Sequence, residues 1–390
     1  MYLRNTVKQM RIVWMVVWLF VVHLGCNDKD AVSDTDTLSQ HLNLPENPYN
    51  YSGIQIPSFL DASLLAQQDN TPANNMVSDW GATLGRVLFY DKLLSINNTT
   101  ACASCHQQEN AFSDADRFSS GFEGGLTNRH SMGLLNAKFR PSGLFFWDGR
   151  APSLEEQVLQ PIQDSLEMGL SLDELIHRIE SQEYYEVLFR LAYGDKGITK
   201  TRIANALAQF LRSIQSFESR YDLGRSEYNR SDSFQNFTQE ENLGKSLFFD
   251  LSRGNCGGCH YTDAFVMDVP RNNGIDVWES TTDKDLGYEA TTGNVNDRGK
   301  FIAPSLRNIA SRPPYMHDGR FSSLREVIDH YSDGIQWSSS LDDHLKAANP
   351  NAPVRFNLSD TEKNALVAFL NTLTDESILV DQRFSDPFIQ

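Results

Sequence analysis

The sequence is poor in positive charge. Its 390 residues include 34 Lys and Arg against 51 Asp and Glu, which gives a formal net charge of −17 at pH 7. Because a nucleic-acid-binding surface needs a basic face for phosphates, this balance argues against nucleic acid as a partner. A composition with 22% charged and 40% hydrophobic residues also excludes a disordered chain and a multi-span membrane protein.

Long apolar runs are also scarce. The run over 12–22 is shorter than the roughly 20 residues that a bilayer-spanning helix needs, and it follows a short basic segment, as in a secretory signal. It leads into His-Leu-Gly-Cys at 23–26, which resembles the cleavage box of bacterial lipoproteins. We therefore expect a lipoprotein-type signal peptide over 1–25, lipidation of Cys26, a polar tether over 26–54 and a membrane-tethered protein in the periplasm. An uncleaved signal anchor is the alternative.

Cysteine is rare, and four of the five cysteines fall in two Cys-x-x-Cys-His units. The units are Cys102, Cys105 and His106, and Cys256, Cys259 and His260. This is the attachment pattern of c-type haem, in which two thiols bind the vinyl groups and the His binds the iron. A four-cysteine zinc site would need its second pair about 15–20 residues after the first, and disulfides within each pair would leave both His unexplained. The sequence therefore predicts two covalently attached c-type haems.

A short segment is repeated ahead of the two units. Residues 84–91 read LGRVLFYD, and residues 243–250 read LGKSLFFD. Since the same segment leads into the same motif twice, the sequence predicts two domains of related design. We place them at 55–235 and 236–380.

Helical patterns dominate the remaining sequence. Apolar residues recur at helical spacing over 203–214 and 366–373, whereas alternating strand-like runs are scarce. Capping boxes of the Ser/Thr-x-x-Glu type mark helix starts at Ser153, Thr238, Ser323 and Ser359. Long loops rich in Gly, Asn and Asp suit a body built around large prosthetic groups. We expect a mainly α fold with long loops, whose last helix packs back on the first domain.

Over about residues 75–375 the chain resembles the bacterial dihaem cytochrome c peroxidase family, which includes the dihaem oxidase that matures tryptophan tryptophylquinone. The motifs that carry the resemblance are RHS at 129–131, LLNA at 134–137, FWDGRA at 146–151, SLEEQ at 153–157, PI at 161–162, EMG at 167–169, PSLRN at 304–308 and PYMHDGR at 314–320. The resemblance implies two cytochrome c-like domains with both haems facing the domain boundary.

The resemblance also implies roles around the first haem. His106 would bind the iron of the peroxide-reactive haem, and Glu167 would be the acid/base on its open side, in a pocket lined by Gln157 and Pro161. An apolar pocket would raise the pKa of this Glu toward neutrality. Trp147 would lie between the haems and carry electrons. The alternatives are a solvated loop carboxylate for Glu167 and a core aromatic for Trp147.

At the second haem the resemblance implies His260 on one side of the iron and Tyr331 on the other. Many family members have a Met in place of this Tyr, whereas the quinone-maturing oxidase has Tyr. An anionic oxygen ligand lowers the haem potential, whereas Met raises it. Met316 and Met267 are the alternative ligands.

Two further departures from the family bear on activation and on calcium. Many members cap the resting first haem with a His from a mobile loop, but the loop over 107–128 contains no His. We therefore expect an open first iron that needs no reductive activation. His130 stands where many members have an Asn calcium ligand, and imidazole suits a hard cation poorly. Calcium would depend on the backbone carbonyls of Arg312 and Pro314, and we do not expect it to be bound.

The function that this resemblance implies is reduction of hydrogen peroxide to water, with electrons from a small cytochrome c or cupredoxin. One rival is a dihaem oxidase that modifies a side chain of a partner protein. The other is a plain dihaem electron-transfer cytochrome with both irons closed by protein ligands.

Overall fold

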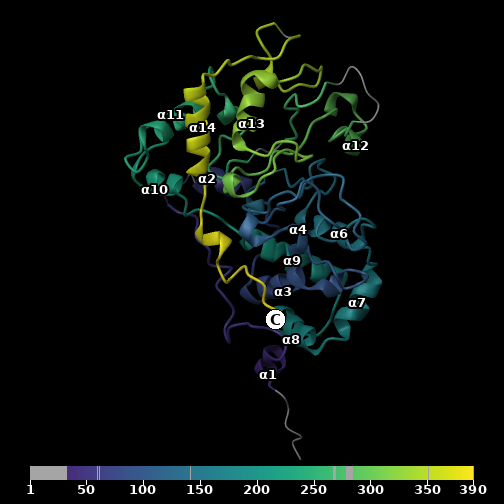
Figure 1. Cartoon of the computed structure of the whole chain (residues 1–390). Helices are drawn as coiled ribbons and strands as arrows, with labels where there is room; N and C mark the ends of the chain where they lie inside the picture. The colour runs from purple at the N-terminus through teal and green to yellow at the C-terminus, as the bar shows by residue number, and fades with distance from the viewer. Residues whose placement is uncertain are drawn as a thin grey trace, which may run out of the picture. The chain divides into compact units, whose positions relative to one another are not determined.

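The computed structural model is predominantly helical (Figure 1). It describes residues 33–58, 60, 62–140, 142–266, 269–277, 284–349 and 351–389. In these ranges β-structure is limited to isolated bridges, which confirms the predicted mainly α class. No helix there is both long and apolar enough to cross a membrane. The predicted signal peptide and Cys26 lie outside the described residues.

The first half of the chain is organised by the packing of α3 (Asp79–Tyr90) along α9 (Lys200–Ser213). A close approach at Gly85 allows this packing, because a Cβ there would lie 2.0 Å from the carbonyl oxygen of Ala206. The other helices of this half are α1 (Asp34–Ser39), α2 (Ala62–Gln68), α4 (Cys102–Cys105), α5 (Leu154–Gln157), α6 (Gln160–Gln163), α7 (Leu172–Glu180) and α8 (Glu183–Tyr193).

The second half repeats this arrangement with α11 (Gln239–Phe249) along α14 (Asp360–Asn371). A Cβ at Gly244 would lie 1.8 Å from the carbonyl oxygen of Ala365, so the helices meet as in the first half. The other helices are α10 (Arg220–Glu227), α12 (Glu289–Thr292) and α13 (Leu324–Asp329), which continues as a π-helical turn over His330–Gly334. The sequence repeat therefore corresponds to a repeated helix pair.

The helix starts follow the capping residues closely. Thr238, Ser323 and Ser359 form both hydrogen bonds of a capping box, as predicted. The Ser153 hydroxyl accepts from the amide of the third helical residue, as a single N-cap. A further capping box begins at Ser219, where the Asp222 carboxylate accepts from the Ser219 amide. The Ser/Thr-x-x-Glu pattern does not include it, because the third helical residue is Asp.

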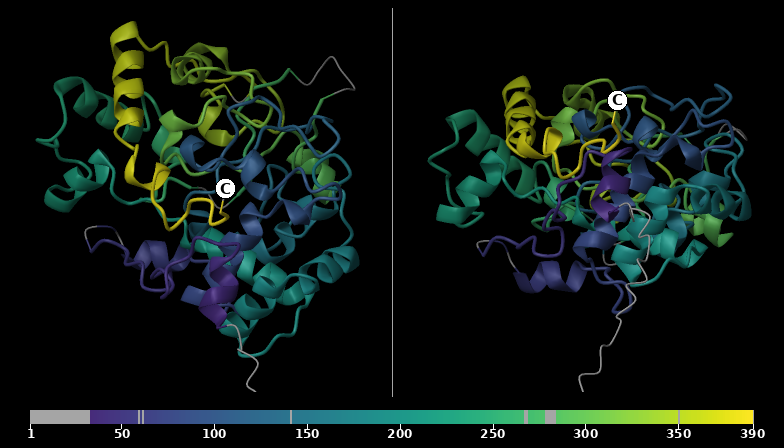
Figure 2. Two further views of the ribbon diagram at one scale, coloured as in Figure 1. Left: turned by 60° about the horizontal axis from the view of Figure 1, so that its bottom comes forward. Right: turned by 90° about the horizontal axis from the view of Figure 1, so that it is seen from below.

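Two hydrophobic cores contain most of the buried side chains. One gathers residues between 38 and 214 together with Ile378 and Phe384, and the other gathers residues between 221 and 373. The last helix, α14, belongs to the second core, and the segment after it returns to the first (Figures 1 and 2). There Gln108 donates hydrogen bonds of 2.9 Å to the carbonyls of Ile378 and Asp381. The domain boundaries proposed from the sequence stay a prediction.

The segment over 34–54 differs from the free polar tether that we expected. It contains α1, and Leu38, Leu42 and Tyr51 are buried in the first core. The amides of Tyr51 and Ser52 also donate to the Asp79 carboxylate, at 2.9 and 2.8 Å. Burial of these apolar side chains stabilises the packed segment relative to a solvated one. Because polar residues separate the apolar ones, the sequence of this segment shows no helix-like or strand-like pattern.

A buried ion pair holds the second half together. Arg307 donates to both oxygens of the Asp222 carboxylate, at 2.7 and 2.8 Å, and the two side chains are 0% and 1% exposed. Arg307 also donates to the carbonyl of Asp263, and Ser219 donates to Asp222. The pair thus joins the cap of α10 to the loops after Cys259.

We predict that Asp222→Asn lowers the free energy of unfolding by about 3–5 kcal/mol, because it leaves the Arg307 charge buried without a full counter-charge. Chemical denaturation followed by circular dichroism measures this. The matched control is Asp343→Asn, at a carboxylate whose side chain is 90% exposed and pairs with Lys346. Its unfolding midpoint should stay close to that of the wild type, and equal effects of the two variants would contradict the prediction.

Candidate functional site

The two Cys-x-x-Cys-His units lie at equivalent places in the two halves. The first forms α4, and the second forms a 3₁₀ turn over Cys256–Gly258. Both follow the repeated helices α3 and α11 within the chain. No disulfide joins any of these four cysteines. Each is therefore available to attach a haem.

Each His of these units is oriented by a backbone carbonyl. Nδ1 of His106 lies 3.0 Å from the Phe112 carbonyl oxygen, and Nδ1 of His260 lies 3.0 Å from that of Phe265. A carbonyl can only accept, so Nδ1 carries the proton and Nε2 is left as a metal ligand. Burial lowers the pKa of His260 to about 4, which keeps the ring in the neutral form that binds a metal.

The two carbonyls are presented by unusual backbone conformations. Phe112 and Phe265 have φ values of 57° and 52°, in the left-handed region that non-glycine residues rarely adopt. Such strain persists where the surrounding structure imposes it, and it is frequent at functional sites. The same device in both halves shows that the two His are held in the same way.

A cavity of about 680 Å³ opens in front of the first unit. Its lining includes five residues that the sequence placed at the first haem: His106, Trp147, Gln157, Pro161 and Glu167. The structure thus brings these residues together from α4, α5, α6 and the loops between them. With His Nε2 and the Cys105 thiol also in this lining, the site fits a haem.

Glu167 is half-buried at the edge of this cavity. Its burial and the negative charge of Asp164 raise its pKa to about 7, against a smaller opposing effect of Arg150. Its backbone is fixed, because the Asp164 carbonyl accepts from the amides of Glu167, Met168 and Gly169 at 2.9–3.1 Å. A carboxyl group with a pKa near neutrality can both accept and return a proton at physiological pH.

A second cavity, of about 200 Å³, opens in front of the second unit. Cys256, Cys259 and His260 line it together with Met316 and Tyr331, the two candidate ligands that the structure describes. Met267 lies outside the described residues. The donor set of this cavity also fits a haem.

The two candidate ligands of the second site face the same amide. Asn273 Nδ2 lies 3.4 Å from the Tyr331 hydroxyl and 3.4 Å from the Met316 sulfur. Tyr331 lies in the π-helical turn after α13, and π-turns are frequent at functional sites. Burial raises the pKa of Tyr331, so the side chain is a phenol until a cation stabilises its anion. No sequence signal identifies Asn273 as part of this site.

Trp147 and His130 line both cavities. The Trp147 indole Nε1 donates to the His130 carbonyl at 2.8 Å, and its ring lies 6.4 Å from that of His317 in an edge-to-face arrangement. Two backbone hydrogen bonds cross between the halves here. The His130 amide donates to the His317 carbonyl at 2.8 Å, and the Ile302 amide donates to the Trp147 carbonyl at 2.9 Å.

Trp147 and His317 are equivalent residues of the repeat. Each follows a residue with positive φ, Phe146 (64°) and Met316 (76°), and each is followed by the sequence Asp-Gly-Arg. Bridges Phe145–Ala151 and Tyr315–Phe321 close the two loops in the same way. The match of residues 147–150 to residues 317–320 is the sequence signal that identifies His317 as part of the site. The repeat of the Cys-x-x-Cys-His units alone does not show this match.

The repeat also relates Pro161 to Tyr331. Ser153 and Ser323 cap equivalent helices, α5 and α13, and both residues come eight positions later. A proline offers no side-chain ligand, whereas a tyrosine does. The two sites therefore differ in what the protein can place opposite each His.

Both ring nitrogens of His130 have hydrogen-bond partners. Nε2 lies 3.2 Å from the Ser113 hydroxyl, and Nδ1 lies 3.2 Å from the Asp116 carbonyl. Burial and the charge of Arg312 lower the pKa of this imidazole. The ring thus ties the loop after the first unit to the segment that contacts Trp147.

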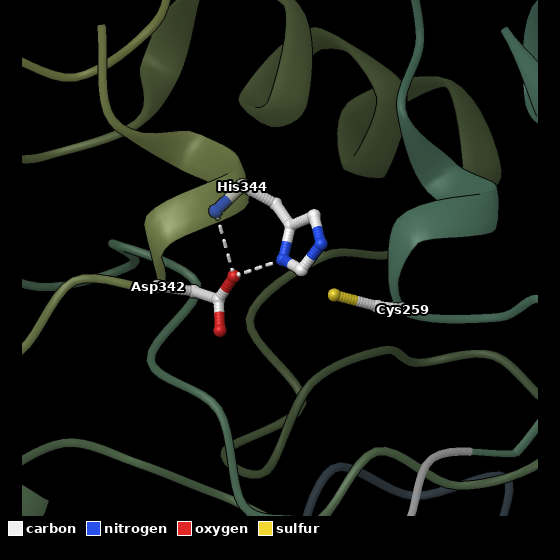
Figure 3. Close-up of side chains that lie close together, drawn as sticks. All are labelled: Cys259, Asp342 and His344. Atoms are coloured by element: carbon white, nitrogen blue, oxygen red, sulfur yellow. Dashed lines mark hydrogen bonds and ion pairs between the residues drawn. The ribbon is translucent and has the colours of Figure 1, made fainter. Parts of the chain in front are cut away.

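Cys259, Asp342 and His344 form a cluster beside the second unit, with potential ligand atoms within 4.8 Å of one another (Figure 3). The Asp342 carboxylate accepts from the ring and the amide of His344 and from Arg271. Burial opposes its ionisation, but these hydrogen bonds hold its pKa below the ordinary value. If the Cys259 thiol is joined to a haem, the cluster is a polar wall of the second cavity and offers no metal site.

Comparison with known proteins agrees with this geometry. A family model described as di-haem cytochrome c peroxidase matches residues 80–229. The methylamine utilization protein MauG of Methylophilus methylotrophus is 33% identical over 305 residues, which cover 77% of this chain and 84% of the relative. Cytochrome c551 peroxidase of Nitrosomonas europaea is 29% identical over 295 residues, with 76% and 80% coverage.

A solved structure shows the same fold. It is the crystal structure of a MauG-like protein associated with microbial copper homeostasis, with a TM-score of 0.72 and 33% identity over 85% of this chain and 98% of that chain. At these levels of identity and coverage, the chain belongs to the di-haem cytochrome c peroxidase family, whose members are oxidoreductases that carry two haems.

Proposed function

We propose that the chain attaches two c-type haems covalently, through Cys102 and Cys105 in the first half and Cys256 and Cys259 in the second. We further propose that it reduces hydrogen peroxide to water with electrons from a small cytochrome c or cupredoxin. The observation that carries this proposal is Glu167, a carboxyl group with a pKa of about 7 in the cavity that also contains His106.

The haems, when bound, supply the iron site for peroxide and the electrons for O–O cleavage. The reaction consumes one peroxide, two electrons and two protons and gives two waters. Glu167 takes a proton from one peroxide oxygen and returns it to the leaving oxygen, so that water and not hydroxide departs. Gln157 and Pro161 shape the space beside this carboxyl group.

Trp147 is proposed as the electron relay between the two sites. Its indole lines both cavities, and its ring nitrogen and its carbonyl are both held by hydrogen bonds to other segments. A fixed, oxidisable aromatic ring between two redox centres shortens the steps that an electron must take. His317, in edge contact with it, is the equivalent residue of the other half.

A second function is favoured by Tyr331 and by the MauG relatives. Tyr331 faces the second cavity, where an anionic oxygen ligand would lower the haem potential and favour the storage of oxidising equivalents. Such a protein would oxidise a side chain of a partner protein. A long-lived two-electron-oxidised state, with no small-protein electron donor, would favour this function over peroxide reduction.

The location of the protein is also proposed from the sequence. A cleaved signal ending before Cys26 would place the protein in the periplasm, with lipid on that cysteine as a membrane anchor. Haem attachment to Cys-x-x-Cys-His units outside the cytoplasm is consistent with this location.

We predict that Glu167→Gln lowers kcat/KM for peroxide by about 10²–10⁴-fold, because the amide can neither take nor return the proton. Steady-state turnover with peroxide and a reduced cytochrome measures the effect, and haem content should stay at two per chain. Glu156→Gln, at an exposed carboxylate of α5, is the matched control and should retain wild-type turnover. Turnover of Glu167→Gln equal to the wild type would remove the assignment.

The pH dependence gives an independent test. Because turnover needs the Glu167 carboxylate, kcat/KM should fall as the pH drops through about 7. Asp164→Asn removes a negative charge that raises the pKa of Glu167, so the acidic limb should move to lower pH. Asn retains an oxygen that can accept from the Leu166 amide, as Asp164 does at 2.8 Å. An acidic limb that does not move in this variant would contradict the role of Glu167.

For the second site we predict that Tyr331→Met raises the midpoint potential of one haem and leaves the other unchanged, since thioether ligation favours the reduced iron. Potentiometric titration with electron paramagnetic resonance of the ferric protein measures both. Met316→Leu is the control and should leave the potential unchanged. The reverse outcome, in which only Met316→Leu alters the spectrum, would identify Met316 as the ligand.

A further inference from the structure

Arg140 is a buried cation with no carboxylate partner among the described residues. Its side chain lines the first cavity, the residue is 5% exposed, and Nε and Nη1 are buried with no hydrogen-bond partner among the described residues. Burial lowers its pKa to about 10, so the guanidinium remains charged at neutral pH. The Phe145 ring centroid lies 5.9 Å from the guanidinium carbon, at the outer limit of a cation–π contact, and such a contact does not neutralise the charge.

The second cavity contains a similar cation. Arg312 lines it and is 7% exposed, and its side chain donates to the Ser305 carbonyl. None of the ion pairs among the described residues supplies it with a carboxylate. Burial lowers its pKa to about 10, so it too remains charged.

The two arginines occupy the same position of the structural repeat. Asn136 and Asn308 have positive φ values of 59° and 54°, and each begins a 3₁₀ turn of three residues. Arg140 ends the first turn, and Arg312 ends the second. The fold therefore places one arginine at the same point of each haem cavity.

Two of the other buried arginines are paired with carboxylates, whereas Arg86, 3% exposed, donates to the Ser385 carbonyl and forms no ion pair among the described residues. Arg307 binds Asp222 through two hydrogen bonds, and Arg212, whose side chain is 1% exposed, binds both oxygens of Glu155 at 2.6 and 3.0 Å. A buried charge without a counter-charge is strongly unfavourable. Arg140 and Arg312 differ from Arg86 because each lines one of the two cavities, which points to anions supplied by the molecules that fill these cavities.

The two other arginines of the first cavity do not compete for such an anion, because carboxylates already neutralise them. Arg129 pairs with Asp148 at 2.7 Å and with Asp285 at 2.6 Å, and Arg150 pairs with Asp148 at 3.0 Å. Arg140 is the arginine of this lining whose guanidinium has no carboxylate among the described residues.

We propose that Arg140 and Arg312 bind carboxylates of the haems, Arg140 at the first haem and Arg312 at the second. This rests on the haem attachment proposed above. A haem presents two propionate carboxylates, and the planar guanidinium fork matches a carboxylate with two parallel hydrogen bonds. Each arginine is then a positioning residue that also sets the charge beside its iron.

The charge has a measurable consequence. A cation held near the iron favours the ferrous state over the ferric state, which carries one more positive charge. Arg140→Met should therefore lower the midpoint potential of the first haem. We expect the ferric-to-ferrous ratio at a fixed potential to change about tenfold, which is 59 mV for a one-electron couple.

The test is a crossed set of variants of the full-length, haem-loaded protein. Potentiometric titration, with the two haems resolved by their spectra, is applied to Arg140→Met, Arg312→Met and Arg140→Lys. Arg140→Met should shift the first haem alone, Arg312→Met should shift the second alone, and Arg140→Lys should stay close to the wild type. Haem content and melting temperature are measured alongside.

Four outcomes would overturn the inference. These are unchanged potentials in both Met variants, equal shifts of both haems in either variant, a shift in Arg140→Lys as large as in Arg140→Met, and equal loss of haem from Arg140→Lys and Arg140→Met, which would indicate a structural role for the side chain. Wild-type protein without haem would overturn the proposed function itself, and haem content distinguishes that failure from the others.

Discussion

Two crossed backbone hydrogen bonds connect the segments that line the two haem cavities. The His130 amide reaches the His317 carbonyl, and the Ile302 amide reaches the Trp147 carbonyl. These bonds fix the backbone of Trp147 where its indole lines both cavities, which is the position that the proposed electron relay requires. Since amides and carbonyls form them, the arrangement tolerates the change of side chain from Trp147 in one half to His317 in the other.

The two halves share one arrangement of helices and differ at a few residues that line the two cavities. The helix pairs, the strained Phe residues that orient the two His, and the buried arginines are shared. What differs is the residue eight positions after the capping serine, Pro161 in one half and Tyr331 in the other, and the carboxyl group of Glu167. A repeated scaffold thus carries one cavity lined by a proline and a carboxyl group and one lined by a tyrosine.

Much of this arrangement could be predicted from local sequence. The Cys units, the helices α9 and α14 and three capping boxes follow from spacing and residue type, which act over a few positions. The position of Asn273 beside Tyr331 and the lack of a carboxylate partner for Arg140 among the described residues could not be predicted, because both depend on which segments meet in the folded chain. The burial of Leu42 and Tyr51 could not be predicted either, since single apolar residues in a polar segment show no helical or strand periodicity.

Residues 377–388 complete the first core after the chain has built the second. A bridge joins Leu42 to Phe388, and the Tyr51 hydroxyl donates to the Arg383 carbonyl at 2.5 Å. The second core, over 221–373, is therefore inserted between two parts of the first. In vectorial synthesis, the inserted half is the one that can close first. The order of folding would then oppose the order of the sequence, with the half that contains Glu167 completed last.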